Sequence, residues 1–269
     1  MTPIESRLRV MSWNLWWQFG PWEERLAAIA ATLAAVDADV IALQEVWHDG
    51  TRNQAAELAA GLGYEHVYAS RLDLDGVQFG NAVLARWPIT NHETMPLPAP
   101  SDADELRLVL RADVDGPRGP IQIFSTHLNW RFDQSHVRQD QVATIARFVD
   151  AAPERIYPPV VCGDFNAVPD SDEIRMMTGR MQTPVNKLVF HDSWEAAGDR
   201  DAGDGFTWSN DNVFAKEDLE PNRRIDYVFV GWPKSEGAGH VVSSHVLATK
   251  PVHGVQPSDH YAVVAELRY

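Results

Sequence analysis

Polar side chains that can bind a metal ion or transfer a proton recur at the ends of short apolar segments along this 269-residue chain. The tripeptide Ser258-Asp259-His260 completes the set. Its other members are Asn14 in Ser-Trp-Asn-Leu, Glu45 in Leu-Gln-Glu-Val, His127 in Ser-Thr-His-Leu, Asp164 and Asn166 in Gly-Asp-Phe-Asn, and Asp226 in Arg-Ile-Asp-Tyr. An α/β scaffold assembles a site from such strand-end residues, drawn from distant parts of the chain. Their chemistry predicts a bound divalent cation and hydrolysis of a phosphate ester.

Hard oxygen donors dominate the candidate metal ligands, which are Glu45, Asp259 and the side-chain amide of Asn14. Such donors suit Mg²⁺, with Mn²⁺ as the alternative ion. The chain has no clustered cysteines and no histidine pairs at zinc spacing, which disfavours a zinc enzyme. We expect a weakly held Mg²⁺ that keeps water molecules and accepts substrate oxygens.

The sharpest single motif is Gly163-Asp164-Phe165-Asn166. Glycine permits a tight turn, and the i, i+2 spacing puts Asp164 and Asn166 on the same face of an extended strand end. The structural alternative is an Asx-type turn, in which the same two residue types hydrogen-bond their own backbone.

Periodicity predicts the elements that position these residues. Helical spacing of apolar residues predicts helices over 22–36, 54–62, 134–149 and 170–177. Short apolar runs predict strands over 8–13, 39–43, 64–69, 81–86, 106–114, 121–126, 159–162, 225–230, 239–247 and 261–267. The segment 184–197 gives no clear pattern, and 97–102 is expected to be a surface loop. Consecutive strands argue against a doubly wound parallel sheet and favour two packed mixed sheets with helices outside, in one domain over 1–269.

Composition restricts the partners. Lys and Arg number 23 against 38 Asp and Glu, which gives a net charge of −15, and an exposed duplex normally needs a basic face. Cys162 is the only cysteine, so no intramolecular disulfide is expected, and its apolar neighbours predict a buried structural thiol. No segment reaches membrane-spanning length and the N-terminus has no long apolar stretch, so we expect a cytoplasmic monomer.

Taken together and in this order, the motifs from Trp13-Asn14 to Asp259-His260 resemble those of the endonuclease/exonuclease/phosphatase superfamily. The superfamily includes AP endonucleases, DNase I-like nucleases, neutral sphingomyelinases and inositol-phosphate phosphatases. The resemblance covers nearly the whole chain and specifies the superfamily far better than the substrate. It implies a four-layer α/β/β/α sandwich with the site at one end of two packed mixed sheets.

The resemblance also implies roles. Glu45 would bind the metal with help from Asn14, and Asp259 would lie at or beside it. Asp164 would orient or deprotonate the attacking water, and Asn166 would position water and phosphate. His260 would contact a phosphoryl oxygen, and Asp226, within hydrogen-bond reach, would polarise its ring. His127 would be a second catalytic histidine. A histidine at position 127, where AP endonucleases carry tyrosine, argues against a dedicated AP endonuclease.

Aromatic and basic residues near these motifs are the candidate substrate contacts. Trp130 and Trp208 occur in polar loops, and we expect them to be exposed in an aromatic-walled cleft. Packing at the sheet edges is the alternative, in particular for Trp13 and Trp22. The candidate anion contacts are Arg131, Arg138, Arg223 and Arg224, with simple surface exposure as the alternative, above all for Arg138. Asn81 precedes an Ala-Val-Leu strand and is expected to line the site.

The sequence therefore predicts a Mg²⁺-dependent phosphoesterase, in particular a phosphodiesterase for a small or exposed phosphate ester. The alternative is a nuclease acting on single-stranded or terminal nucleic acid. A catalytically inactive binding module is least favoured, because every motif is intact.

Overall fold

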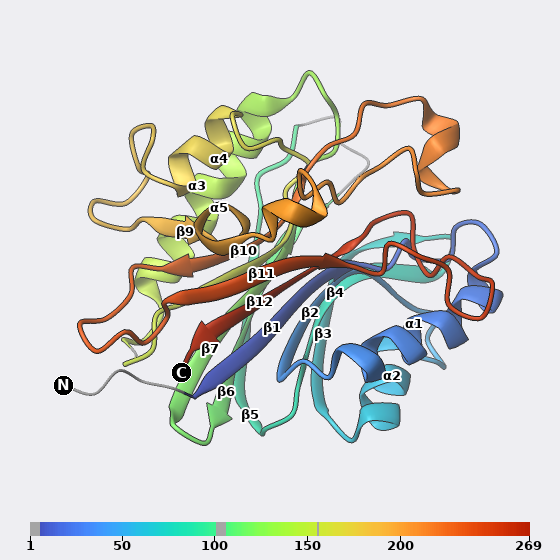
Figure 1. Ribbon diagram of the computed structural model, residues 1–269, viewed down its shortest axis with the longest axis horizontal. Coiled ribbons are helices and arrows are strands. Elements are labelled where there is room, and N and C mark those ends of the chain that lie inside the picture. The colour runs from blue at the N-terminus through green and yellow to red at the C-terminus, as the bar shows by residue number, and fades with distance from the viewer. Residues whose placement is uncertain (1–5, 101–105, 155) are drawn as a thin grey trace.

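Two mixed β-sheets of six strands each pack face to face, with helices on both outer faces (Figure 1). The computed structural model describes residues 6–100, 106–154 and 156–269. The four layers confirm the α/β/β/α sandwich expected from the sequence.

The first sheet contains, in spatial order, β11 (Val241–Leu247), β12 (Ala262–Arg268), β1 (Arg7–Asn14), β2 (Val40–His48), β4 (Val77–Ala85) and β3 (Glu65–Leu74). The second contains β5 (Ile89–Pro96), β6 (Leu108–Gly116), β7 (Gly119–His127), β8 (Val160–Asp164), β10 (Asp226–Gly231) and β9 (Phe190–Asp192). The helices are α1 (Trp22–Val36), α2 (Gln54–Leu62), α3 (Ser135–Ala151), α4 (Asp172–Met177) and α5 (Ser193–Ala197), with 3₁₀ turns η1 (Arg200–Ala202) and η2 (Ala215–Asp218).

Three apolar layers hold the sandwich together. Small and β-branched side chains such as Val10 and Val160 fill the space between the sheets. The helices α1 and α2 pack on the outer face of the first sheet, for example through Ile29, while α3 packs on the second sheet through Ile145 (Figure 1). Because the central strands are buried on both faces, apolar residues predominate on both faces instead of on one alone.

Each sheet has one pair of parallel strands joined by a helix, β1-α1-β2 in the first and β7-α3-β8 in the second. In the first pair Asn14 lies opposite Gln44, and in the second His127 lies opposite Asp164. The antiparallel strand β10 begins at Asp226, which is also opposite Asp164. The carboxyl ends of both pairs therefore meet at one end of the sandwich, and this arrangement delivers the motif residues there.

The structure differs from the sequence-based expectation at the edges. The edge strand β5 was not predicted, because it is mostly exposed and polar and so lacks an apolar repeat. The unclear segment 184–197 holds the short strand β9 and α5. The predicted surface loop over 97–102 begins with Leu97, which is instead buried in the apolar layer under α3. Residues 101–102 of that loop lie outside the described residues.

None of the helices in the described ranges combines the length and apolar character needed to cross a lipid bilayer.

Candidate active site

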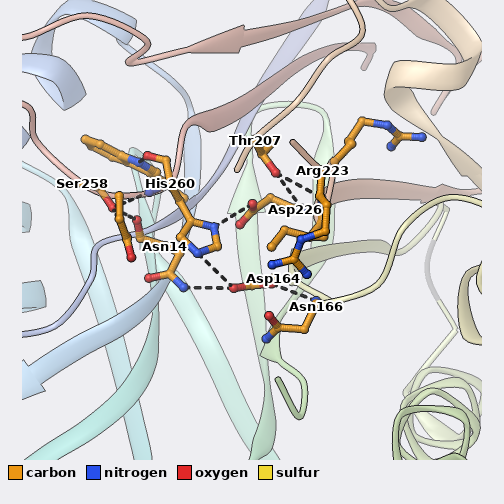
Figure 2. A network of polar contacts seen from close by, with 12 residues as sticks. Asn14, Asp164, Asn166, Thr207, Arg223, Asp226, Ser258 and His260 are labelled. Carbon is orange, nitrogen blue, oxygen red and sulfur yellow. Dashed lines mark hydrogen bonds and ion pairs between the residues drawn. The ribbon is translucent and has the colours of Figure 1, made fainter. Parts of the chain in front are cut away.

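Asp164, the last residue of β8, lies at the centre of a polar network (Figure 2). Its Oδ2 accepts a hydrogen bond from Nδ2 of Asn14 at 3.0 Å. The same oxygen is 3.6 Å from Nε2 of His260 and 3.5 Å from Nε2 of His127. Its Oδ1 accepts the backbone N–H of Asn166 at 2.9 Å, and Asn166 has a left-handed φ of 50°. The motif thus forms the Asx-type turn considered from sequence, and that turn aims Asp164 into the site.

His260 forms an ion pair with Asp226, with Nδ1 2.9 Å from Oδ2, which confirms the expected contact (Figure 2). Asp226 is itself fixed through its backbone N–H, which donates to Oγ1 of Thr207 at 3.1 Å. Burial alone would lower the pKa of His260, but the carboxylates of Asp226, Asp164 and Asp259 outweigh burial and raise this pKa well above its ordinary value. His260 is therefore an imidazolium at neutral pH, with Nε2–H directed toward Asp164.

His127 is the opposite case. Its Nδ1 is 3.0 Å from Nη1 of Arg107, and because a guanidinium can only donate, Nδ1 must accept. Nε2 lies 3.1 Å from Nδ2 of Asn166, which also bonds the backbone oxygen of Leu128, and 3.5 Å from Oδ2 of Asp164. Burial lowers the pKa of His127 well below its ordinary value, and the charges of Arg107 and His260 lower it further. One carboxylate thus lies between a charged histidine and a neutral one.

Glu45 lies at a β-bulge, where the pairing of β2 with β4 is interrupted. The register between β2 and β4 shifts between Leu43 and Val46, and Glu45 has a φ of 53°. Its Oε1 accepts from Nδ2 of Asn14 at 3.0 Å, while Oε2 is buried and has no hydrogen-bond partner. Burial raises the pKa of Glu45, and the hydrogen bond from Asn14 opposes this. A buried carboxylate oxygen without a donor is costly unless a cation satisfies it.

Asp259 adds a second buried carboxylate near Glu45. Burial raises the pKa of Asp259 to about 7, and the charge of Glu45 adds to this effect. Oδ1 of Asp259 lies 3.2 Å from Oγ of Ser258, whose single proton is shared with the nearer backbone oxygen of Asn14 at 2.7 Å. Two mutually repelling carboxylates and an unsatisfied oxygen fit the donor set of a hard divalent cation.

The side chain of Asn14 is not oriented as expected for a metal ligand. Its Oδ1 accepts the backbone N–H of Trp16 at 2.9 Å, which fixes the orientation of the amide. The amide nitrogen therefore faces Glu45 and Asp164, and a protonated nitrogen cannot bind a metal. Asn14 orients the two carboxylates across the interface between the sheets.

A second group could also hold an ion. Ligand atoms of Asp164, Asp226 and His260 all lie within 4.8 Å of one another. His260 pairs with Asp226, and a protonated imidazole has no lone pair for a metal, so this group fits an ion less well than the carboxylates of Glu45 and Asp259.

A cleft of about 500 Å³ opens over these residues. Glu45, Asp164 and Asp259 lie along its polar side. Its walls are aromatic, formed by Trp16, Phe19, Phe79, Trp130, Phe132 and Trp208. The arrangement can hold a phosphate over the carboxylates and histidines, with a flat or apolar group against the rings.

Sequence comparison agrees with this geometry. A profile of the "Endonuclease/Exonuclease/phosphatase family" matches residues 11–260. The chain belongs to this family. Its members hydrolyse phosphate esters, so the broad activity of the chain is that of a phosphoesterase or a nuclease-like protein.

Individual relatives are distant. The chain is similar to inositol phosphosphingolipids phospholipase C of Schizosaccharomyces pombe, with 26% identity over 95% of this chain and 67% of that protein. It is 30% identical to the uncharacterized protein YbhP of Escherichia coli K12, over 52% of this chain and 58% of that one. That second match therefore spans less than two thirds of YbhP.

Among solved structures, the endonuclease/exonuclease/phosphatase from Beutenbergia cavernae is 28% identical with a TM-score of 0.71, covering 97% of this chain and 71% of that one. The structure of D. rerio TDP2, complexed with single strand DNA product, has a TM-score of 0.76 over 98% of this chain and 100% of that one. Its 19% identity supports the shared fold alone.

In this family member the predicted aromatic contacts line the cleft, but in different ways. Trp130 is exposed, with 44% of its surface accessible. Trp208 was expected to be exposed and is instead buried, because its ring packs edge-on against His260 at 5.0 Å. Arg131 does not line the cleft, and its guanidinium stacks on the Trp130 ring at 4.9 Å.

Two predicted substrate contacts are corrected by the structure. Asn81 is buried and does not line the cleft, although it lies close to His127 and Arg107; its Nδ2 donates to the backbone oxygen of Leu108 at 3.2 Å and so links the two sheets. Arg224 forms a buried ion pair with Asp192 at 2.7 Å and does not line the cleft. Its neighbour Arg223 does line it.

Sequence reasoning missed three residues of the site. Arg107 and Phe79 line the cleft but occur in no recognisable motif. Arg25 is fully buried beneath the aromatic turn after β1. The available signal was its position four residues before Ile29, on the apolar face of the predicted helix.

Proposed function

We propose that this chain is a Mg²⁺-dependent phosphodiesterase that hydrolyses a small or exposed phosphate ester by attack of water. The observation that carries the proposal is the position of Asp164 between a charged and a neutral histidine, beside the carboxylates of Glu45 and Asp259. A base, donors for phosphoryl oxygens and a cation-binding acid pair are the parts that this reaction requires.

Asp164 would orient the attacking water and accept its proton. Burial, reinforced by the charge of Asp226, raises the pKa of Asp164 to about 7, which makes its carboxylate a stronger base than an exposed aspartate. Asn166 would hold the water and the phosphate against this carboxylate.

The two histidines would bind the phosphoryl oxygens. His260 can donate from Nε2 as a cation, and Asp226 keeps the ring charged and in one orientation. His127, whose Nδ1 is occupied by Arg107, would face the phosphate through Nε2, beside the side-chain amide of Asn166. These groups are held in place before the negative charge on the phosphate increases in the transition state, so little reorganisation is needed.

Glu45 and Asp259 would hold Mg²⁺, which supplies Lewis-acid assistance at the phosphate when bound. The unsatisfied Oε2 of Glu45 supports this assignment. Asn14 would keep both Glu45 and Asp164 in place through its amide nitrogen.

The walls of the cleft support a diester with a flat or apolar leaving group. Aromatic rings surround the phosphate position, while Arg223 lies near Asp218 and Glu220 at the rim. A rim of mixed charge suits one or two phosphates better than a duplex backbone. The lipid phosphodiester in the name of the fission-yeast relative agrees with this class.

A nuclease for single-stranded or terminal nucleic acid is the second candidate. Trp130 and Phe132 are both exposed at the cleft, and bases can stack on such rings. The two candidates share the catalytic residues and differ in what the aromatic wall binds.

The test is turnover of bis(p-nitrophenyl) phosphate, p-nitrophenyl phosphate, sphingomyelin and a single-stranded oligonucleotide, each with and without Mg²⁺. We expect Mg²⁺-dependent hydrolysis of at least one small diester, and loss of it in Glu45→Gln. The exposed Glu57→Gln serves as the matched control. Hydrolysis of the oligonucleotide alone would favour the nuclease, and binding without any turnover would leave the inactive module.

A further inference from the structure

Arg25, in the first turn of α1, has no exposed surface. Its guanidinium donates only to backbone carbonyl oxygens. Nη1 bonds the oxygens of Leu15 at 2.7 Å and Pro257 at 3.0 Å, and Nη2 bonds those of Trp16 at 2.8 Å, Trp17 at 2.9 Å and Phe19 at 3.0 Å. The two nitrogens therefore hold two different segments of the chain.

The Nη2 side holds a turn that is unfavourable by itself. Trp16 and Trp17 have φ angles of 58° and 34°, in the left-handed region that residues other than glycine rarely adopt. Such a conformation persists only where its surroundings over-determine it. The guanidinium supplies three hydrogen bonds to this turn and also lies 4.8 Å from the centre of the Trp16 ring, a wall of the cleft.

The Nη1 side joins the end of β1 to the segment that carries Asp259. Pro257 precedes Ser258, whose Oγ donates to the backbone oxygen of Asn14 at 2.7 Å. These contacts make Arg25 one of the groups that position Asp259 relative to β1, together with Asn212, whose Nδ2 donates to the backbone oxygens of Ser258 and Asp259 at 2.9 Å.

The charge of Arg25 is compensated in an unusual way. Within the described ranges no carboxylate is hydrogen-bonded to it. Burial lowers its pKa to about 10, and the charges of Asp259 and Glu45 oppose that decrease. Arg25 is thus a cation at neutral pH, with the two proposed metal ligands as its main counter-charges.

We propose that Arg25 is a positioning residue that couples the aromatic wall at Trp16 to the metal-binding carboxylate of Asp259. One guanidinium nitrogen fixes the turn and the other fixes the segment before Asp259, so a change at either place is transmitted to the other. The catalytic and metal-binding consequences rest on the proposed function, whereas the attachment of both segments to one guanidinium does not.

Three variants test the coupling. Arg25→Met removes the charge and the donors at similar length, and Arg25→Lys keeps the charge with fewer, differently directed donors. Arg111→Met is the matched control, because Arg111 is also buried but pairs with Glu93 and Asp113 outside the cleft.

The first readout is limited proteolysis with chymotrypsin, with cleavage after Trp16, Trp17 and Phe19 mapped by mass spectrometry. We expect protection of this turn in the wild type and in Arg111→Met, and at least tenfold faster cleavage there in Arg25→Met. Arg25→Lys should give an intermediate rate.

The second readout is the Mg²⁺ concentration at half of the maximal thermal shift. Groups that orient metal ligands typically change metal affinity by about 10–100-fold when mutated, so we expect about a tenfold rise in Arg25→Met and a smaller rise in Arg25→Lys. Arg111→Met should lower the melting temperature without changing the half-saturating concentration. With bis(p-nitrophenyl) phosphate, KM should rise more than kcat falls when Mg²⁺ saturates.

Wild-type values of either readout in both Arg25 variants would overturn the coupling. If Arg25→Met does not fold, Arg25→Lys decides the question by the same two readouts. A wild type that turns over no substrate but shows the predicted cleavage and Mg²⁺ shifts would refute the proposed function and leave the coupling intact. A wild type with no Mg²⁺-dependent thermal shift would refute the metal site, and with it the coupling to Asp259.

Discussion

The two parallel strand pairs each place a buried arginine at the beginning of their connecting helix, but the two charges are balanced differently. Arg25 lies eleven residues after Asn14, and Arg138 lies eleven residues after His127. Arg138 donates from Nη1 to the backbone oxygen of Arg131 at 2.7 Å. This bond fixes the loop that carries Trp130.

Arg138 also has a carboxylate of its own. Its Nε donates to Glu173 of α4 at 2.5 Å, and Glu173 is fully buried and accepts a further hydrogen bond from Ser135. Within the described part of the chain, Arg25 is hydrogen-bonded only to carbonyl oxygens, with the carboxylates of Asp259 and Glu45, the proposed metal ligands, as nearby counter-charges. We refer to each sheet with the helices packed on it as one half of the molecule. In the second half, the charge of Arg138 is balanced by Glu173 within the same half. In the first half, the charge of Arg25 is balanced by the carboxylates of the site.

The largest expected effect separates the catalytic residues of the two halves. Asp164→Asn, in the second half, should lower kcat by about 10²–10⁴-fold, because it removes the base, while keeping the Mg²⁺-induced thermal shift. Glu45→Gln, in the first half, should lose both turnover and the thermal shift. If Asp164→Asn also abolished the thermal shift, the metal would belong to the group of Asp164, Asp226 and His260.

The next effect concerns stability. Glu173→Gln leaves Arg138 as a buried, uncompensated cation, and the free energy of unfolding should fall by about 3–5 kcal/mol. Mg²⁺ half-saturation should remain unchanged, because this ion pair lies in the other half. Urea denaturation with and without Mg²⁺ measures both quantities. A shifted Mg²⁺ response in Glu173→Gln would remove the distinction between the two halves.

A smaller effect follows from pH. Burial raises the pKa of both Asp164 and Asp259 to about 7, above the value of an unfolded aspartate. The folded chain then keeps protons that the unfolded chain has released, so metal-free stability should fall as pH rises from about 4 to about 7. Mg²⁺ needs the ionised carboxylates, so its stabilising effect should grow across the same range. Melting temperatures with and without Mg²⁺ at about pH 5 and about pH 8 test this, and an equal Mg²⁺ shift at both would contradict it.

The smallest effect is on the substrate side. Trp130→Ala should raise KM by a factor of about 5–100, since stacking of a flat group on one exposed ring contributes about 1–3 kcal/mol. The metal response should not change. The mixed charge of the rim also predicts a shallow dependence of kcat/KM on salt, and a steep one would indicate a longer nucleic-acid substrate.

The sequence predicted the central strands and the three longest helices, because continuous apolar runs and helical spacing are strong in buried elements. The meeting of Asp226 with His260 was implied by the resemblance to the family and not by periodicity. It failed where the signal is not periodic. The edge strand β5 is held by backbone pairing with β6 and not by an apolar face. Asn81 and Arg224 looked like ligand contacts because residue type alone does not distinguish a substrate contact from a buried partner such as Leu108 or Asp192.

The first strand β1 pairs with the last strand β12, and Arg7 lies opposite Arg268. Two further hydrogen bonds join the end of β1 to residues 258–260. One runs from Trp13 Nε1 to the backbone oxygen of His260, and the other from Ser258 Oγ to the backbone oxygen of Asn14. During synthesis β1 is made long before β12, so it gains its second neighbour only after β12 has emerged. His260 and Ser258, which bonds the backbone of Asn14, emerge just before that strand. The candidate site therefore cannot assemble until the segment from Pro257 to β12 has been synthesised.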